Sequence, residues 1–217
     1  MKDEKELTEE IYANLVQDKP FNLKKIEKFF NLANRGFKDI WTGWYSRGKT
    51  PPNLEVDIIN VFEDIRKKID DALIIATEVK FFKDLKNRGF YEGLGQILSY
   101  SIFGFDGLSL WHLFQKDIDG DKIQNFSNAT KQVLIGFNLP IFYLCGRLVD
   151  EEKLIIQSFA PSVGNMGSLK YFVEWMCKHV GEDNIRNILL FEDKPLDSYA
   201  EEIQRRRKTL KVTLKIP

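Results

Sequence analysis

Charged side chains interrupt two of the most apolar segments of this 217-residue chain. Glu55 and Asp57 lie within "LEVDIINVF", and Glu78 and Lys80 lie near the end of "ALIIATEVKFF". Burying an ionised group costs more free energy than packing returns, unless a partner or a metal compensates the charge. These four residues are therefore the first candidates for a functional site.

Their spacing predicts that the four side chains meet. Side chains on a strand alternate between two faces, so Glu55 and Asp57 share one face, and so do Glu78 and Lys80. If the two segments form neighbouring strands, three carboxylates and one ammonium converge near one end of a sheet. Clustered carboxylates repel each other unless a divalent cation lies between them, and oxygen ligands with incomplete protein coordination suit Mg²⁺.

Such a site suits phosphodiester hydrolysis. A metal held by these carboxylates can polarise a phosphoryl oxygen and lower the pKa of a bound water. Lys80, beside it, could orient or deprotonate that water, or neutralise the charge that develops during the reaction.

The order of these residues resembles the PD-(D/E)xK nucleases, whose restriction-endonuclease-like fold also includes Holliday-junction resolvases and RecB-type exonucleases. "EVD" and "EVK" match the two strand motifs of that family, and "QILSY" matches the Q-x-x-x-Y motif of its RecB-type branch. The resemblance covers about residues 22–115 and departs from the pattern at Val56, where the motif has proline. It implies a nuclease that acts on DNA and leaves RNA open as a substrate.

The resemblance also implies a role for each matching residue. Asp57 and Glu78 would bind Mg²⁺, for which Mn²⁺ would substitute, and the main-chain carbonyl of Val79 would add a ligand. Lys80 would be the catalytic lysine.

Three further positions follow from the same resemblance. Gln96 and Tyr100, four residues apart on one helix face, would support the metal ligands or contact a phosphate. The family also has an acidic residue on an upstream helix. Glu27, in a helix predicted over residues 22–35, is the best match, and Glu10 is the second.

Basic residues near these motifs are expected to hold nucleic-acid phosphates. They are Arg47, Lys49, Lys83, Lys86 and Arg88. Trp41, Trp44 and Tyr45 precede the first two and could stack on bases, although such residues are more often part of a core. The strict alternation of "KTLKVTLKI" at 208–216 predicts a half-buried strand whose lysines face outward. Cleavage of both strands of a duplex would favour a homodimer.

Two other interpretations stay open. An acidic-x-Lys tripeptide occurs five times in this chain, and only the copy at 78–80 ends an apolar strand segment and precedes a Gln/Tyr helix. The charges could instead lie on the solvent face of an edge strand and form cross-strand ion pairs. Alternatively, the chain could be a catalytically silent nuclease-fold module that binds nucleic acid or assembles with other proteins.

The order of the expected helices and strands, which must position these residues, predicts one α/β domain over residues 1–217. It has a mixed central sheet of the restriction-endonuclease-like type flanked by helices, with extra N-terminal and C-terminal helical elements. N-terminal helices occupy 1–35, the catalytic core 36–115, and the remaining strands and C-terminal helices 116–217. Hydrophobic spacing predicts helices at 6–17, 22–35, 91–104, 128–138, 168–181 and 198–208. It predicts strands at 36–46, 53–63, 72–82, 107–114, 139–148 and 153–161.

Composition narrows the class of protein without identifying a partner. The 43% hydrophobic content predicts a packed core, and 32 basic residues balance 32 acidic ones. No apolar run reaches the roughly 18 residues of a spanning helix, so we expect a soluble cytoplasmic protein with no membrane partner. Cys145 and Cys177 are too far apart for a CxxC site, which predicts two reduced thiols.

Overall fold

The structure is a computed structural model that describes residues 2–32, 54–64, 72–86, 88–148, 154–160, 168–180, 185–190 and 197–216. The predicted strand at 36–46 and several predicted nucleic-acid contacts lie outside these residues. Those contacts are Trp41, Trp44, Tyr45, Arg47 and Lys49.

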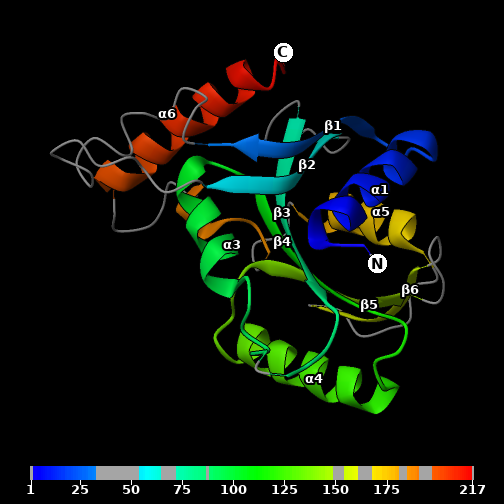
Figure 1. Ribbon diagram of the computed structural model, residues 1–217. Coiled ribbons are helices and arrows are strands. Elements are labelled where there is room, and N and C mark those ends of the chain that lie inside the picture. The colour runs from blue at the N-terminus through cyan, green and yellow to red at the C-terminus, as the bar shows by residue number, and fades with distance from the viewer. Residues whose placement is uncertain are drawn as a thin grey trace, which may run out of the picture.

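A six-stranded mixed sheet forms the centre of the fold (Figure 1). Its order follows the sequence: β1 (Leu23–Asn31), β2 (Glu55–Glu63), β3 (Ala72–Phe82), β4 (Gly107–Phe114), β5 (Ile141–Leu148) and β6 (Leu154–Ala160). β1, β2 and β3 are antiparallel neighbours, β3, β4 and β5 are parallel, and β6 is antiparallel to β5. The predicted α/β class with a mixed sheet is confirmed.

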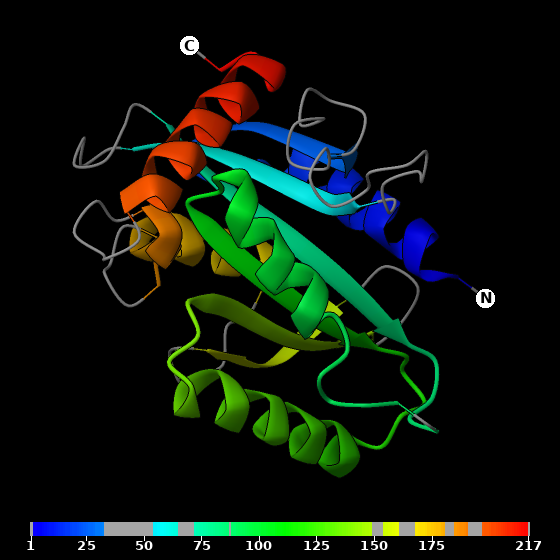
Figure 2. The ribbon, with the colours of Figure 1, turned by 90° about the vertical axis from the view of Figure 1, so that its left-hand side faces the viewer.

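Helices cover both faces of this sheet (Figures 1 and 2). α1 (Glu4–Gln17) and α5 (Leu169–His179) bury apolar side chains against one face. α3 (Leu94–Tyr100), α4 (Gly120–Gly136) and α6 (Asp197–Thr213) pack on the other, together with the short 3₁₀ segment Ser101–Phe103. A second 3₁₀ segment spans Ile188–Leu190. α4 begins earlier than predicted because Asp119 caps it and accepts hydrogen bonds from two backbone N–H groups.

The helix predicted over residues 22–35 is wrong, because residues 23–31 form β1. Leu23, Ile26 and Phe30 are spaced as on a helix, yet the pairing with β2 shifts between Leu23 and Lys25. Phe29 also has a positive φ of 49°. These irregularities displace the apolar residues from the two-residue period of a regular strand. β1 is an edge strand, and lysines on it are typical of edges that resist pairing with another chain.

The predicted C-terminal strand is also wrong. α6 continues to Thr213 and buries Leu210 and Leu214, which are four residues apart, whereas Val212 is exposed. Apolar residues that alternate along a strand also occur four residues apart, which is a helical spacing. The segment 208–216 therefore fits either structure by its pattern, and packing against the sheet selects the helix. The Arg207 guanidinium anchors the helix through a buried ion pair with the Asp106 carboxylate.

Both cysteines are buried free thiols, as predicted. No helix within the described residues has the length and apolar character that crossing a bilayer requires.

Candidate active site at the edge of β3

The site forms where β2 separates from β3. The two strands pair from Glu63 and Ala72 as far as Ile58 and Thr77. β3 continues to Phe82 and stays paired with β4 on its other side. No strand among the residues that the structure describes pairs with the remaining edge, so its N–H and C=O groups need other partners.

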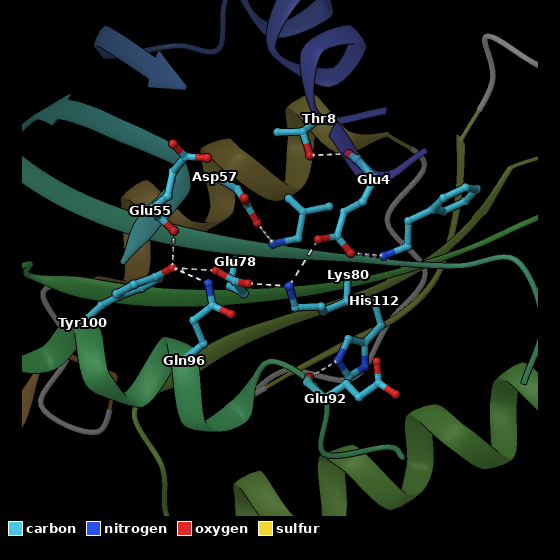
Figure 3. Close-up of polar contacts among 12 residues, drawn as sticks. Glu4, Thr8, Glu55, Asp57, Glu78, Lys80, Glu92, Gln96, Tyr100 and His112 are labelled. Atoms are coloured by element: carbon cyan, nitrogen blue, oxygen red, sulfur yellow. Dashed lines mark hydrogen bonds and ion pairs between the residues drawn. The ribbon is translucent and has the colours of Figure 1, made fainter. Parts of the chain in front are cut away.

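Two carboxylates take the place of the missing strand (Figure 3). The Val79 N–H donates to Asp57 Oδ2 over 2.7 Å, and the Phe81 N–H donates to Glu4 Oε2 over 3.1 Å. Both acids therefore satisfy backbone donors on the uncovered edge of β3.

Local sequence signals at the start of α1 position Glu4. Asp3 and Glu6 form a capping box, in which each side chain accepts a hydrogen bond of 2.8 Å from the other's backbone N–H. Leu7, Ile11 and Leu15 repeat every four residues and are buried against the sheet. The helix thus begins at a defined residue, and its first turn reaches the edge of β3.

The Glu78 side chain is fully buried, with no solvent exposure. Its Oε1 lies 2.6 Å from Lys80 Nζ, and its Oε2 lies 2.6 Å from the Tyr100 hydroxyl. Lys80 Nζ also contacts Glu4 Oε1 at 3.2 Å. One ammonium therefore lies between carboxylates from β3 and α1.

α3 adds a hydrogen-bonded pair on the opposite side of Glu78. Gln96 Nε2 donates to the Tyr100 hydroxyl over 3.1 Å, and that hydroxyl also lies 2.7 Å from the Glu55 carbonyl oxygen. A hydroxyl has one proton, so it can donate fully to Glu55 or to Glu78, not to both.

Gly93 lets α3 approach the site this closely. It has a φ of +80°, and a Cβ atom there would lie 2.8 Å from Leu110, 3.2 Å from Lys80 and 3.5 Å from Glu78. A side chain would be strained by this backbone and would push against the proposed catalytic groups.

Burial and mutual repulsion shift the protonation of the site. Burial, and then the charge of Glu78, raise the pKa of Asp57 to about 8. Burial also raises the pKa of Glu78, against the opposing effects of Lys80 and Tyr100. Burial alone would lower the pKa of Lys80, but the Glu78 and Glu4 carboxylates outweigh it and raise that pKa to about 12. Lys80 is therefore an ammonium at neutral pH, which favours charge stabilisation over deprotonation of a water.

Asp57, Glu78 and the Val79 carbonyl are the groups here that could hold a partly hydrated hard cation. Within the described residues, no three His, Cys, Asp or Glu side chains are grouped as a complete metal site would require. Asp57 and Glu78 do lie close enough for their charges to interact. The N–H and C=O of one strand residue point to the same side, so the Val79 carbonyl shares the uncovered edge. Two carboxylates and one carbonyl would leave positions for water, as Mg²⁺ sites commonly do.

The structure thus brings together most of the residues predicted for catalysis and metal binding. Asp57, Glu78, Lys80, Gln96 and Tyr100 form one connected set, next to Val79. Glu55 joins it through its main-chain carbonyl rather than through its carboxylate.

Both acids predicted for the upstream helical position pair with lysines close to them in the sequence. Glu27 lies on β1, not on a helix, and pairs with Lys25 at 2.8 Å, while Glu10 pairs with Lys2 at 2.6 Å. Glu4 is the helical acid that reaches the site. The sequence signals the start of its helix through the capping box, but nothing local predicts which strand that helix contacts.

The remaining predicted phosphate contacts in the described part of the chain are Lys83, Lys86 and Arg88. All three are exposed in the segment between β3 and α3. Arg88 forms a loose ion pair with Glu92 at 3.4 Å.

Comparisons of this chain with protein-family models, with curated proteins and with solved structures found no match. The likeness to the PD-(D/E)xK nucleases therefore stays a prediction from the motif residues.

Proposed function

We propose that this chain is a Mg²⁺-dependent nuclease that hydrolyses phosphodiester bonds in DNA. One observation carries the proposal: Asp57, Glu78 and Lys80 meet beside an edge of β3 with which no described strand pairs, and Gln96 and Tyr100 lie next to them. Buried carboxylates with raised pKa values beside an ammonium are typical of catalytic sites.

In this proposal Asp57, Glu78 and the Val79 carbonyl hold the cation. When bound, Mg²⁺ or Mn²⁺ would supply Lewis-acid stabilisation of a phosphoryl oxygen and lower the pKa of a water. The Lys80 ammonium neutralises charge that develops on the phosphate, where a preorganised donor is most effective. Tyr100, held by Gln96, fixes the orientation of Glu78.

Glu4 takes the role that the resemblance gives to an upstream helical acid. Its carboxylate contacts both Lys80 Nζ and the Phe81 N–H, so it holds the ammonium at the edge of β3. Cleavage of both strands of a duplex would need two such sites, which a symmetric dimer provides.

The test is cleavage of linear, nicked, branched and single-stranded DNA with Mg²⁺ or Mn²⁺. Lys80→Ala should lower the rate on the order of 10²–10³-fold, the usual effect of removing one transition-state donor, while DNA binding is largely kept. Lys24→Ala is the matched control, because Lys24 pairs with Glu63 at the surface of the edge strand. Equal residual cleavage by wild type and Lys80→Ala would exclude Lys80 from catalysis.

A catalytically silent module is the second candidate. The Lys80 ammonium already compensates the Glu78 and Glu4 carboxylates, so these charges persist without a cation. A wild-type protein that binds DNA, gains no thermal stability from Mg²⁺ or Mn²⁺ and cleaves none of these substrates would favour this function over the nuclease.

A further inference from the structure

Tyr91 lies in the segment that joins β3 to α3 and is 64% exposed. A Cβ atom on Gly89 would lie 2.5–2.9 Å from three ring atoms of Tyr91, so the ring rests directly on the glycine backbone. The Phe90 ring meets it in a T-shaped contact with centroids 5.5 Å apart. The ring is thus supported by protein although most of it faces solvent.

Buried groups fix the backbone on both sides of this tyrosine. The Thr130 hydroxyl of α4 lies 3.0 Å from the Phe90 carbonyl oxygen and 3.1 Å from the Phe126 carbonyl oxygen, so its one proton is shared between them. His112 Nε2 of β4 lies 2.9 Å from the Glu92 carbonyl oxygen (Figure 3), and because a carbonyl only accepts, this nitrogen carries the proton. An exposed aromatic ring on an anchored backbone loses little conformational entropy when a ligand stacks on it.

The backbone that carries the ring is close to the proposed active site. Tyr91 precedes Gly93 by two residues, so their Cα atoms are at most about 7–8 Å apart. Gly93 in turn lies against the side chains of Lys80 and Glu78. His112, which anchors this segment, is the β4 residue opposite Lys80 in the ladder.

The charge of the segment suits a nucleic-acid strand. Lys83 and Lys86 are exposed and form no ion pair with any residue that the structure describes, and Arg88 is exposed beside them. Asp84 and Glu92 lie in the same segment and Glu92 pairs with Arg88, so Lys83 and Lys86 are the cations left for phosphates. Exposed lysines beside an aromatic ring are a combination by which proteins hold single strands, through phosphate contacts and base stacking.

We propose that Tyr91 stacks on an unpaired base of the nucleotide adjacent to the scissile phosphate, so that the substrate is single-stranded or locally unpaired DNA. This inference rests on the nuclease function proposed above. In an intact duplex both faces of a base are already stacked, and opening the helix costs energy. A single strand offers a free base face to the ring without that cost.

The experiment measures binding separately from cleavage. Fluorescence anisotropy with Ca²⁺ in place of Mg²⁺ gives the Kd for a single-stranded oligonucleotide and for its blunt duplex. Tyr91→Ala should weaken single-strand binding on the order of tenfold and duplex binding by much less, whereas Tyr91→Phe should keep the affinity. Phe137→Ala, which removes a 75% exposed ring after α4, is the matched control and should change neither Kd.

Single abasic sites placed along the oligonucleotide test the stacking partner. Wild type should lose affinity at one position beside the mapped cleavage point, and Tyr91→Ala should be insensitive to the same site.

Two results would overturn the inference, and they are distinguishable. If wild type binds and cleaves DNA but Tyr91→Ala binds both substrates normally, or loses both equally, the stacking role is wrong and the nuclease function stands. If wild type neither binds nor cleaves any DNA, the proposed function itself fails, and this inference fails with it.

Discussion

Asp57→Asn should make the metal-free protein more stable at pH 8. The carboxylate of Asp57 is largely buried beside Glu78, which raises its pKa from 3.8 to about 8. An amide carries no charge to desolvate, and its oxygen can accept the same hydrogen bond from the Val79 N–H. The substitution therefore removes an electrostatic cost and keeps the contact at the strand edge.

The direction of the pH dependence follows from proton linkage. Below pH 3.8 Asp57 is protonated in both the folded and the unfolded chain, and its ionisation costs the fold nothing. Between pH 3.8 and about 8 the folded chain keeps a proton that the unfolded chain releases, so the free energy of unfolding falls as the pH rises. This loss of unfolding free energy is complete once the pH exceeds the pKa of Asp57 in the folded chain.

The raised pKa of Asp57 sets an upper limit on the stability gained by Asp57→Asn. One pKa unit corresponds to about 1.36 kcal/mol, so the interval from 3.8 to about 8 allows at most about 6 kcal/mol. Neighbouring charges and water rearrange on ionisation, and we expect a measured gain of about 1–3 kcal/mol at pH 8. The gain should shrink steadily towards pH 5.

Denaturant unfolding in EDTA at pH 5, 6.5 and 8 measures this difference. Asp57→Ala is the informative control, because it removes the charge and also leaves the Val79 N–H unpaired, at a cost of about 1–3 kcal/mol. Adding Mn²⁺ at pH 8 should stabilise wild type and not Asp57→Asn, since only the ionised carboxylate is a strong metal ligand. Parallel pH profiles for wild type and Asp57→Asn would refute the proposed burial of a charge at this position.

Three further substitutions test how the site is built. Glu4→Gln should lower kcat/KM for DNA cleavage by about tenfold or more, whereas Glu27→Gln should leave it unchanged; equal effects would mean that Glu4 does not act on the ammonium. Tyr100→Phe removes the hydroxyl that contacts both β2 and β3 and should lower the free energy of unfolding by about 1–2 kcal/mol in denaturant titrations. Gly93→Ala should destabilise the fold by about 1–3 kcal/mol and slow cleavage, because its φ is +80° and the new methyl group would lie 2.8 Å from a leucine of β4. Gly95→Ala, where no atom lies within 4 Å of the added carbon, should be neutral or stabilising by up to about 1 kcal/mol.

The central strands of this fold could be predicted because their signal is local. Residues 55–63 and 72–82 are apolar, rich in β-branched side chains and bounded by polar segments, and both are buried strands. The placement of Gln96 and Tyr100 on one side of α3 could also be predicted, since residues four apart on a helix share a face. These elements alone predict that Asp57, Glu78 and Lys80 meet.

The elements at the margins of the sheet could not be predicted in the same way. β1 is an irregular edge strand, and its bulge gives its apolar residues a spacing like that of a helix. The alternating C-terminal segment belongs to α6, which begins upstream at Asp197. In both cases the decisive contact is distant in sequence: β1 pairs with β2, and Arg207 of α6 reaches Asp106. The contact of Glu4 with β3 could not be predicted from the sequence either, because it depends on where α1 packs against the sheet.

The end of β3 beyond Thr77, with which β2 and the other described strands on that side do not pair, gives the strongest physical argument that these acids act chemically. A chain that only needed to satisfy the Val79 N–H could do so with asparagine, or by extending β2, and would avoid burying a charge. Instead Asp57 supplies an ionisable group whose pKa is raised to about 8, next to a second buried carboxylate. Proteins retain the electrostatic cost of a buried charge where activity needs that charge. Removing the charge commonly increases stability and reduces function. Asp57→Asn should therefore show both effects in one molecule: higher stability at pH 8 and no metal-dependent cleavage. A variant that gained stability and still cleaved DNA would mean that the charge of Asp57 has no part in the reaction.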